Sequence, residues 1–489
     1  MRVVVVGAGL GGLAAACHLV GRGHDVVVLE RAATPGGVAG VVEEHGYHLD
    51  TGPAVLTMAS LLETTFAAAG STLEQHLHVH RLDPMYRACF ADGTELAVRA
   101  GVDAMAAEID GFAGAREAAG FRRFVGWLRE LYEAEFGPFI VRSFDSPVEL
   151  LRQPRALARL ARLGALGRLA PRVASYFADE RLQRVFSFQA LYAGLSPFDA
   201  LAVFSIITYM DTVEGVLFPT GGMHEIAVGL ARAAEDAGVT LAYSSPVTRI
   251  ERGPDGVVSG VRVGGGDRVG ADAVVCNADV AATYRTLLGI APPRVVARGT
   301  YSPSCALWIA GVRGALPPRA AHHNLHFGRA WRDAFSTLLD DGRRMPDPSI
   351  LVTSATATDP GLAPDGGTTL YALEPVPNLA GPLDWAVEGP RAQADLRARV
   401  GELGYPVDDV VVERFLDPPA WAAQGLERGT PFSLAHQFFQ SGPFRTRNVD
   451  DRVPGLVLVG MGTVPGVGIP MVLVSGQLAA DRVEAWGQR

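Results

Sequence analysis

Short apolar runs at the N-terminal end of the chain alternate with glycines and charged residues. Residues 2–6 are an arginine followed by four valines, the pattern of a strand that is buried on both faces. Glycines fill most of 7–12, and 13–19 has the alanine- and leucine-rich composition of a helix. A second valine-rich run at 25–29 is followed by Glu30. This order of strand, glycine turn, helix, strand and acidic residue predicts a βαβ unit in a parallel sheet.

Each glycine of the turn has its own physical task in such a unit. Gly7 allows the tight turn, Gly9 lets the backbone approach a pyrophosphate, and Gly12 lets the helix pack close to the sheet. The helix N-terminus, at Leu10 and Gly11, offers free N–H groups and a partial positive charge to the phosphates. The segment therefore predicts a dinucleotide-binding site.

A second glycine pair distinguishes the kind of dinucleotide. Glu30 is placed to accept hydrogen bonds from a ribose, and Arg31, Gly36 and Gly37 follow it. A nicotinamide dehydrogenase has no need of that pair, whereas an FAD that runs on past the sheet edge does. With these residues the chain resembles the large family of flavoproteins with two dinucleotide folds, which includes amine oxidases and carotenoid desaturases. The family usually has an arginine near the pyrophosphate where this chain has Val38, and Arg31 is a candidate to replace that contact.

The resemblance extends to segments that return to the cofactor in that family. Three of them look like parts of the FAD domain: 46–53, 218–223 and 244–250. Pro53 lies in the first, and in such proteins the residue at the place of Val247 pairs its backbone with the adenine. Asn277 follows a valine-rich strand that closes the unit. The resemblance implies that these three residues contact FAD.

The stretch 455–471 is the most diagnostic part of the chain. A strand feeds a glycine- and proline-rich turn, and the next helix directs its N–H groups at the flavin side of the cofactor. The expected contacts are Gly462, Thr463, Gly468, Ile469, Pro470 and Met471. Together with 444–445 and 181–188, this stretch resembles bacterial-type phytoene desaturases over nearly the full chain. Many relatives have His where this chain has Val464, so no side-chain acid or base can act from that position.

These patterns predict an α/β fold: a discontinuous, Rossmann-like FAD-binding domain with an inserted, mixed α+β region that binds substrate and associates with a membrane. The predicted FAD domain has three parts, and its two interruptions build the substrate side. The boundaries are 1–79, 211–290 and 448–489 for the FAD domain, 80–210 for a helical substrate- and membrane-associating insertion, and 291–447 for a substrate domain.

Composition narrows the chemistry. The chain has 489 residues, 48% of them apolar, and all 43 basic residues are arginine, which excludes a Schiff-base lysine. A net charge of −9 argues against a nucleic-acid partner. The four cysteines lack metal-ligand spacing, and we expect no metal site and reduced thiols in a cytoplasmic protein. The uncharged stretch 453–480 contains prolines and glycines that would break a membrane-spanning helix, so none is predicted.

An arginine-rich segment favours a membrane surface. Residues 150–178 contain six arginines and no acidic residue, and the first four are spaced along one helical face beside leucines. The segment either docks on anionic lipid or is a solvated helix face over core leucines. A forty-carbon hydrocarbon stays in the bilayer, because each CH₂-sized unit gains roughly 0.8 kcal/mol on leaving water. The resemblance therefore implies peripheral attachment to the cytoplasmic membrane.

The implied reaction is FAD-dependent desaturation of a long, apolar polyprenyl chain, above all phytoene to lycopene in carotenoid biosynthesis. Side chains cannot accept an electron pair, whereas the flavin N5 can take a hydride from an allylic carbon, and quinone or oxygen would reoxidise it. Glu149 and Arg152 are the catalytic candidates, because relatives have an acidic residue and an arginine there. The alternative for this pair is a local ion pair between residues i and i+3.

Two other functions stay open at this stage. One is an FAD-dependent reductase, cyclase or isomerase of another polyene on the same fold, favoured by the loss of the family's Arg and His at Val38 and Val464. The other is a flavin-free lipid carrier.

Overall fold

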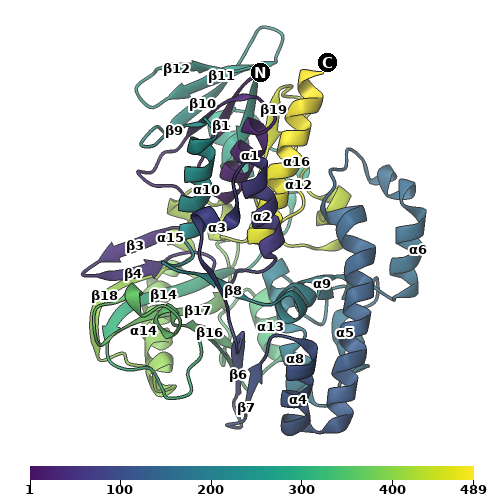
Figure 1. Cartoon of the computed structure of the whole chain (residues 1–489), viewed down its shortest axis with the longest axis vertical. Helices are drawn as coiled ribbons and strands as arrows, with labels where there is room; N and C mark the ends of the chain where they lie inside the picture. Colours follow the sequence, from purple (N-terminus) through teal and green to yellow (C-terminus); the bar gives the residue numbers. More distant parts are fainter. Residues whose placement is uncertain (489) are drawn as a thin grey trace.

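Five parallel strands form the sheet at one end of the molecule (Figure 1). The computed structural model describes residues 1–488. The strand order is β19 (Leu456–Leu458), β13 (Ala273–Cys276), β1 (Arg2–Val6), β2 (Asp25–Leu29) and β9 (Thr240–Ala242). All four pairings are parallel, and Val6 of the central strand lies beside both Cys276 and Leu29. Segments far apart in the sequence thus build one sheet, which confirms the predicted discontinuous, Rossmann-like fold.

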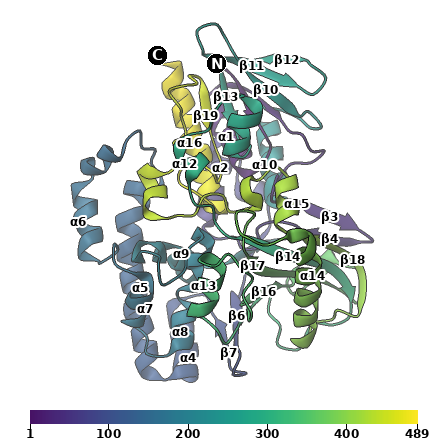
Figure 2. The ribbon, with the colours of Figure 1, turned by 180° about the vertical axis from the view of Figure 1, so that it is seen from behind.

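Helices cover this sheet at very short range. The helix α1 (Leu10–Val20) packs against α16 (Ile469–Gly487), α10 (Glu225–Asp236) and α2 (Ala59–Ala68). At Gly476 of α16, a Cβ atom would lie 2.5 Å from the Ala14 Cβ and 2.7 Å from the Ala15 nitrogen. Glycine is therefore required for the first and the last helix of the chain to touch. The two termini consequently lie at the same end of the molecule (Figures 1 and 2).

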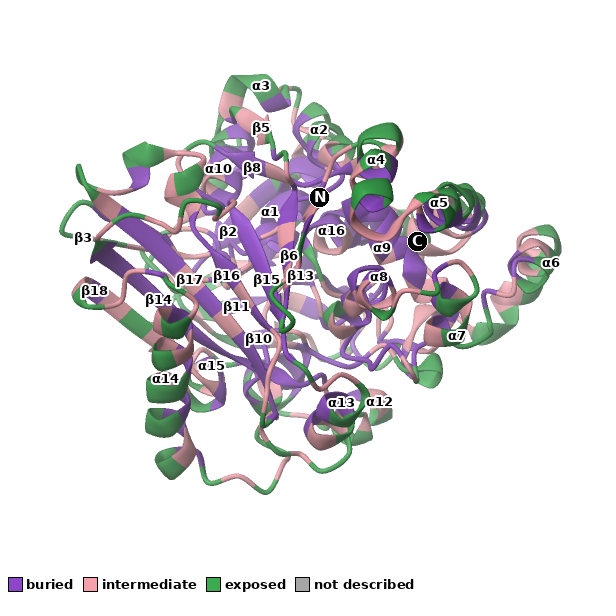
Figure 3. Ribbon diagram, turned by 90° about the horizontal axis from the view of Figure 1, so that it is seen from below, coloured by how far each residue is buried: buried purple, intermediate pink, exposed green. Residues whose placement is uncertain are grey.

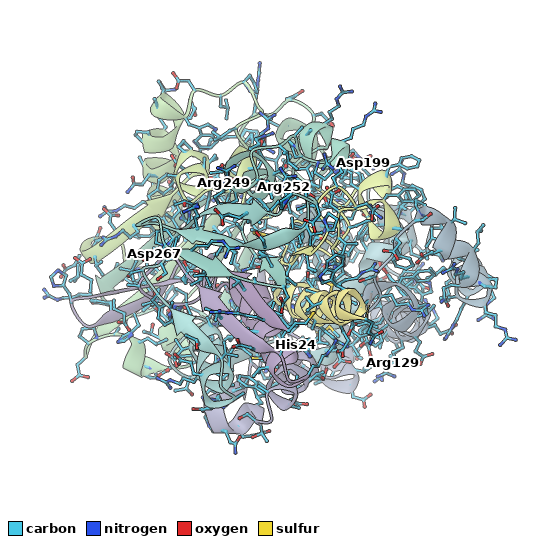
Figure 4. All side chains as sticks on the ribbon, turned by 90° about the horizontal axis from the view of Figure 1, so that it is seen from above. His24, Arg129, Asp199, Arg249, Arg252 and Asp267 are labelled. Atoms are coloured by element: carbon cyan, nitrogen blue, oxygen red, sulfur yellow. The ribbon has the colours of Figure 1, made fainter. Side chains whose placement is uncertain are left out.

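A small antiparallel sheet caps the same end. It consists of β10 (Val247–Arg252), β11 (Val258–Val263) and β12 (Arg268–Gly270), the hairpin unit that its glycine turns favour. Figure 4 looks down on this end and labels three exposed positions of the sheet: Arg249, Arg252 and Asp267.

The second large sheet is mixed and has seven strands. Its order is β18 (Asp409–Leu416), β14 (Ser304–Arg313), β17 (Gly367–Val376), β16 (Ile350–Thr353), β15 (His323–Phe327), β6 (Tyr86–Phe90) and β7 (Glu95–Val98). The helix α14 (Trp385–Glu402) packs on β14 and β17. Residues 80–98 were predicted as part of a helical insertion, but β6 pairs with β15 and β7 with β6. This segment is therefore β-structure rather than helix, because β15, far along the chain, provides the neighbouring strand.

A helical arm lies beside the seven-stranded sheet. It contains α4 (Val102–Ala113), α5 (Ala115–Glu135), α6 (Pro154–Arg162), α7 (Leu169–Ala174), α8 (Glu180–Val185) and α9 (Ser205–Tyr209). Aromatic rings hold it together: Phe124 of α5 lies 5.5 Å from Phe177 and 5.7 Å from Phe186, measured between ring centroids. Figure 3 shows the central strands of the seven-stranded sheet as mostly buried, its edge strand β18 as more exposed, and much of α5 and α6 as exposed.

Short elements complete the chain. They are the strand pairs β3 (Val41–Glu44) with β4 (Tyr47–Asp50) and β5 (Val79–Arg81) with β8 (Leu217–Pro219), and the helices α3 (Leu73–His76), α11 (Val280–Ala282), α12 (Arg294–Arg298), α13 (Arg332–Leu339) and α15 (Pro418–Ala423). Over residues 1–488, no helix has both the length and the apolar composition needed to cross a membrane. The uncharged stretch 453–480 instead forms β19, a turn and part of α16.

Two glycines in helices, one in the contact between α1 and α16 and one in α5, should respond in opposite ways to substitution by alanine. Gly476→Ala should lower the free energy of unfolding by about 1–3 kcal/mol, because the added methyl overpacks the contact with Ala14. Gly126→Ala, in α5, should raise it by about 0.5–1 kcal/mol, since that Cβ meets nothing within 4 Å and alanine is the better helix former. Thermal unfolding of the two variants measures both effects, and equal melting temperatures would contradict the contact.

Candidate active site

One large cavity lies between the two large sheets. Its volume is about 1140 Å³, and residues of both sheets line it, among them Val6 of β1 and Tyr371 of β17. Pockets for a single small molecule typically measure ~300–1,000 Å³. This cavity therefore has room for a cofactor and part of a second molecule.

The structure brings most of the predicted cofactor residues to the wall of this cavity. They come from separate chain segments and meet because the five-stranded sheet places its strand ends side by side. The predicted residues on the wall are Gly7, Gly9, Leu10, Gly11, Glu30, Arg31, Gly36, Gly37, Val38, Pro53, Val247, Asn277, Gly462, Gly468, Ile469, Pro470 and Met471.

The first glycine turn is packed around the Asn277 side chain. Gly7 has a φ of +97°, a conformation that favours glycine, and its N–H donates to the Leu29 carbonyl at 2.8 Å. A Cβ on Gly9 would lie 2.6 Å from Asn277 Nδ2, and one on Gly11 would lie 2.8 Å from Asn277 Oδ1. A side chain at either place must therefore displace the Asn277 amide, whereas glycine leaves the backbone of the turn open to a ligand in the cavity.

Gly12 does not line the cavity. A Cβ there would lie 2.1 Å from the Gly7 carbonyl oxygen, so this glycine permits the close approach of α1 to the sheet. The sequence assigned it the same packing task.

Glu30 lies at the end of β2 with its carboxylate buried. Its Oε2 accepts a hydrogen bond from the Ala8 N–H at 2.7 Å, and its Oε1 accepts one from the Ala32 N–H at 2.8 Å. A carboxylate has about four acceptor positions, so two remain for hydroxyl donors of a ligand. The side chain is thus held in place by backbone amides while it lines the cavity.

The second glycine pair folds back onto the first turn. The Gly36 N–H donates to the Ala8 carbonyl at 2.9 Å, and Gly36 has a φ of +118°. Arg31 lines the cavity, and its guanidinium donates to the carbonyl of Gln424. Val38 also lines the wall and offers no charge, so Arg31 is the cation of this segment that a phosphate can reach.

A buried arginine fixes the turn before α16. Arg445 is 2% exposed and donates to the carbonyls of Met461 at 2.7 Å and Thr463 at 3.1 Å, as well as to those of Leu434 and Gln440. Burial lowers the pKa of Arg445 to about 10. Four carbonyl acceptors from three segments therefore lock the loop that carries Gly462 toward the N-terminus of α16.

Thr463, predicted as a cofactor contact, is not among the residues that line the cavity. Its side chain is fully buried, and Oγ1 donates to the Thr446 carbonyl at 2.7 Å. The hydroxyl therefore stabilises the turn from behind, whereas Gly468, the residue before α16, faces the cavity. The N-terminus of this long helix brings a partial positive charge to that wall.

The remaining wall of the cavity is largely apolar. Aliphatic and aromatic side chains from the helical arm and from the seven-stranded sheet line it: Phe139, Ile140, Phe188, Tyr192, Phe204, Ile206, Ile207, Leu325, Phe327, Trp331, Phe335 and Leu351. Such a wall excludes water and accepts a hydrocarbon.

Several ionisable side chains that the sequence patterns did not single out also lie on the cavity wall. Among them are Glu135, Asp211, His323 and His436. Burial raises the pKa of Glu135 well above its usual value and that of Asp211 to about 7, and it lowers the pKa of both histidines well below 6.5. A lone carboxyl inside an apolar run, as at Asp211, is the one signal that the sequence carried.

Glu149 and Arg152, predicted as catalytic residues, are not among the residues that line the cavity. Both lie in the short helix η2 (Pro147–Arg152), where Arg152 Nη1 is 3.8 Å from Glu149 Oε1 and the Arg152 side chain is 79% exposed. The alternative, a local ion pair, describes what the structure shows.

Comparison with known proteins adds three kinds of evidence. The model of the family described as flavin containing amine oxidoreductase matches residues 10–484. The chain is 48% identical to a phytoene dehydrogenase of Streptomyces griseus, over 99% of this chain and 95% of that protein. It is 38% identical to a zeta-carotene-forming phytoene desaturase of Myxococcus xanthus, over 99% and 94% of the two chains. A lycopene-forming phytoene desaturase of Pseudescherichia vulneris is 33% identical, over 98% of both chains.

Solved structures share the fold at much lower identity. An oxidoreductase from Methanosarcina mazei superposes with a TM-score of 0.66 and 18% identity, over 98% of this chain and 100% of that one. In residues 1–488, no group of three His, Cys, Asp or Glu side chains is arranged to hold a metal ion.

The packing around Asn277 predicts a loss of flavin binding in Gly9→Ala. The new methyl must displace the Asn277 amide, which lies 2.6 Å from its position, and so distort the turn that meets the pyrophosphate. We expect the purified variant to contain at most a tenth of the bound flavin of the wild type. Gly265→Ala is the control, since that Cβ meets nothing within 4 Å and its turn lies outside the cavity wall. Full flavin content in Gly9→Ala would contradict the assignment.

Proposed function

The chain belongs to the family of flavin containing amine oxidoreductases, and we propose that it desaturates a long polyprenyl hydrocarbon, phytoene, to lycopene. It is an FAD-dependent oxidoreductase that acts on CH–CH bonds. One observation carries the proposal: a single cavity joins a glycine cradle for a dinucleotide to a wall of aliphatic and aromatic side chains.

The residues of the cradle fit FAD. The turns at Gly9, Gly11 and Gly36 leave no room for a Cβ atom, and Glu30 keeps two acceptor positions for a ribose. The N-termini of α1 and α16 direct N–H groups at the wall. When bound, FAD supplies a hydride acceptor at the flavin N5, which side chains cannot supply.

The side chains of the apolar wall orient the substrate and exclude water from it. Phe188, Phe327 and Trp331 line the apolar wall, so a polyene in contact with them leaves its water behind. The faces of aromatic rings attract positive charge, which favours an allylic cation over the neutral chain as charge develops. These side chains therefore act without being proton donors or acceptors.

The relatives favour oxidation over the other reactions of such folds. The three curated relatives are named as a dehydrogenase or as desaturases, so the alternatives of a reductase, cyclase or isomerase find no support in them. A flavin-free lipid carrier is disfavoured by the cradle. We propose quinone or oxygen as the electron acceptor.

Phytoene in liposomes provides the test of this function. Purified protein with bound FAD should convert it to coloured products under oxidising conditions, with added double bonds detected by absorption and mass spectrometry. Omission of both quinone and oxygen should stop turnover after the flavin is reduced once. Conversion that occurs only when a reductant is supplied, or no conversion of phytoene at all, would refute the proposal.

We further propose that the protein attaches peripherally to the cytoplasmic membrane through an exposed apolar patch, defined as Val148, Leu151, Phe438 and Phe439. Their exposed fractions are 68%, 73%, 50% and 73%. The two pairs come together because η11 (Gly442–Phe444) contacts η2, and the Phe444 ring lies 5.4 Å from that of Phe439.

The exposed apolar patch borders the cavity. Ser441 and Gly442, which follow Phe439 along the chain, line the cavity wall. This segment lies between α16 and α6 in the two side views (Figures 1 and 2). A hydrocarbon that leaves a bilayer at this patch can therefore enter without crossing water.

Arginines flank the exposed apolar patch, which favours an anionic lipid surface. Arg159 and Arg162 of α6 pair with Glu133 at 2.7 Å and Glu130 at 3.6 Å, and so hold α6 on α5. Arg152 is 79% exposed, and Arg155 is exposed as well. The first arginines of the basic segment are thus available to lipid, while the later ones serve packing.

Paired substitutions test the exposed apolar patch. The double variant Phe438→Ser, Phe439→Ser should bind vesicles of mixed neutral and anionic lipid at least tenfold more weakly, since each buried Phe contributes about 1.5–3 kcal/mol. Its matched control is Leu379→Ser, Val387→Ser, two exposed apolar residues on another part of the surface. Equal binding of both double variants in vesicle sedimentation would refute the patch as the attachment site.

A further inference from the structure

A single carboxyl group stands in the apolar wall where α9 ends. Asp211 is 4% exposed, lines the cavity and lies in the π-helical turn η5 (Met210–Glu214) that continues α9. Within residues 1–488, no ion pair of this carboxylate is formed at 4.0 Å or less. A buried carboxyl without a cation is costly, so its retention in an apolar wall calls for a chemical reason.

Two neutral donors hold the Asp211 carboxyl in place. Gln189 Nε2 donates to Oδ2 at 3.0 Å, and Thr212 Oγ1 donates to Oδ1 at 2.7 Å. Gln189 is itself fixed, since Nε2 also donates to the Val185 carbonyl and Oε1 accepts from Thr208 Oγ1 at 3.3 Å. Both donors face the carboxyl oxygens, an arrangement that supports the ionised form.

The other groups around the Asp211 carboxyl are aromatic. Two phenols are nearby, those of Tyr86 on β6 and Tyr192 beside Phe188. Desolvation raises the pKa of each, and the Asp211 charge adds to the rise. The Phe188 ring lies edge to face with both tyrosines, at 5.9 Å and 5.8 Å between centroids. Because the pKa of each phenol is raised, both stay neutral near pH 7, and the carboxylate is the one negative charge among Asp211, Tyr86 and Tyr192.

Two series of contacts link the surroundings of this carboxyl to the predicted cofactor residues of the same cavity. Tyr371 donates to the carbonyl of Gly52, the residue before Pro53, at 2.8 Å. The same phenol lies within electrostatic range of Tyr192, which in turn lies within range of Asp211. On the other side, Met210 packs in one apolar cluster with Met471 of α16.

We propose that Asp211 is the base that accepts the proton lost from the substrate, an inference that rests on the proposed desaturation. Forming a C=C bond removes a hydride from one carbon and a proton from its neighbour. The hydride carries its electron pair to the oxidised flavin of the cofactor. The second C–H bond then breaks: its proton goes to a carboxylate oxygen of Asp211, and its electrons form the new double bond.

The electrostatics of the site agree with this assignment. Burial raises the pKa of Asp211 from 3.8 to about 7, and the bonds from Thr212 and Gln189 limit that rise. When the pKa of a base lies near the working pH, a large fraction of the base is ionised and it still has a strong tendency to accept a proton. Below pH 7 the folded protein holds this carboxyl protonated and unable to accept a proton, so turnover should fall about tenfold for each further pH unit.

Asp211→Asn tests the proposal, because the amide keeps the shape but cannot act as the base. We expect a loss of turnover of about 100-fold or more, with bound flavin and melting temperature unchanged, and the disappearance of the acid limb near pH 7. Asp211→Glu should recover part of the turnover and keep an acid limb. Glu117→Gln is the matched control: this buried carboxyl accepts backbone N–H groups away from the cavity. It should leave the pH profile unchanged.

Infrared difference spectra across pH 5–9 give a readout independent of turnover. The wild type should show a protonated carboxyl band that titrates near pH 7 and is absent in Asp211→Asn, or in Asp211→Ser should the first variant fold poorly. A band that persists in both, or a variant that retains wild-type turnover and acid limb, would overturn the proposal. A wild type that shows the band but converts no phytoene would instead refute the proposed function.

Discussion

The structure depends on joining two environments with opposite demands in one cavity. A dinucleotide carries phosphates and riboses that need N–H donors and a carboxylate, whereas a hydrocarbon tolerates neither water nor unpaired polar groups. The protein meets the first demand with backbone rather than side-chain charge. Turns at Gly9, Gly36 and Gly468 bring N–H groups to the wall, and Glu30 is itself held by two backbone amides. The second demand is met by aromatic and aliphatic residues from elements far away in the sequence.

Two polar side chains make this arrangement rigid. Asn277 fills the space between Gly9, Gly11 and Gly460, so the first glycine turn and the start of the C-terminal loop share one spacer. Arg445 gathers four carbonyls behind the same loop. Neither residue needs a charged partner, because every contact is made with a backbone or amide group. The flavin-side loop is therefore stabilised from behind, and its front stays available to a ligand.

The apolar end follows the same logic with its own exceptions. The apolar wall also contains ionisable groups, among them Asp211, Glu135, His323 and His436. Burial raises the pKa of the two carboxyls and lowers that of the two histidines, so it favours the neutral form of each. Asp211 differs from the other carboxyl, Glu135, because the side chains of Gln189 and Thr212 donate hydrogen bonds to its oxygens. Hydrogen bonds to one carboxylate stabilise its ionised form, whereas the other three of these groups stay neutral. The exposed apolar patch lies beside Ser441 of the same wall, and the proposed attachment to a membrane rests on that neighbourhood.

Local sequence patterns are sufficient to predict the cofactor end of the protein. Strand, turn and helix there are local, and each glycine is required by backbone geometry within a few residues, so the spacing of Gly7, Gly9 and Gly12 carries the information. Tertiary structure alone decided which residues face the apolar end. Glu149 and Arg152 were singled out by position and lie outside, Thr463 turns its hydroxyl inward to Thr446, and strands β6 and β7 join a sheet built mostly from residues 304–416. The direction of such side chains depends on contacts between segments hundreds of residues apart, and no periodicity within one segment records those contacts.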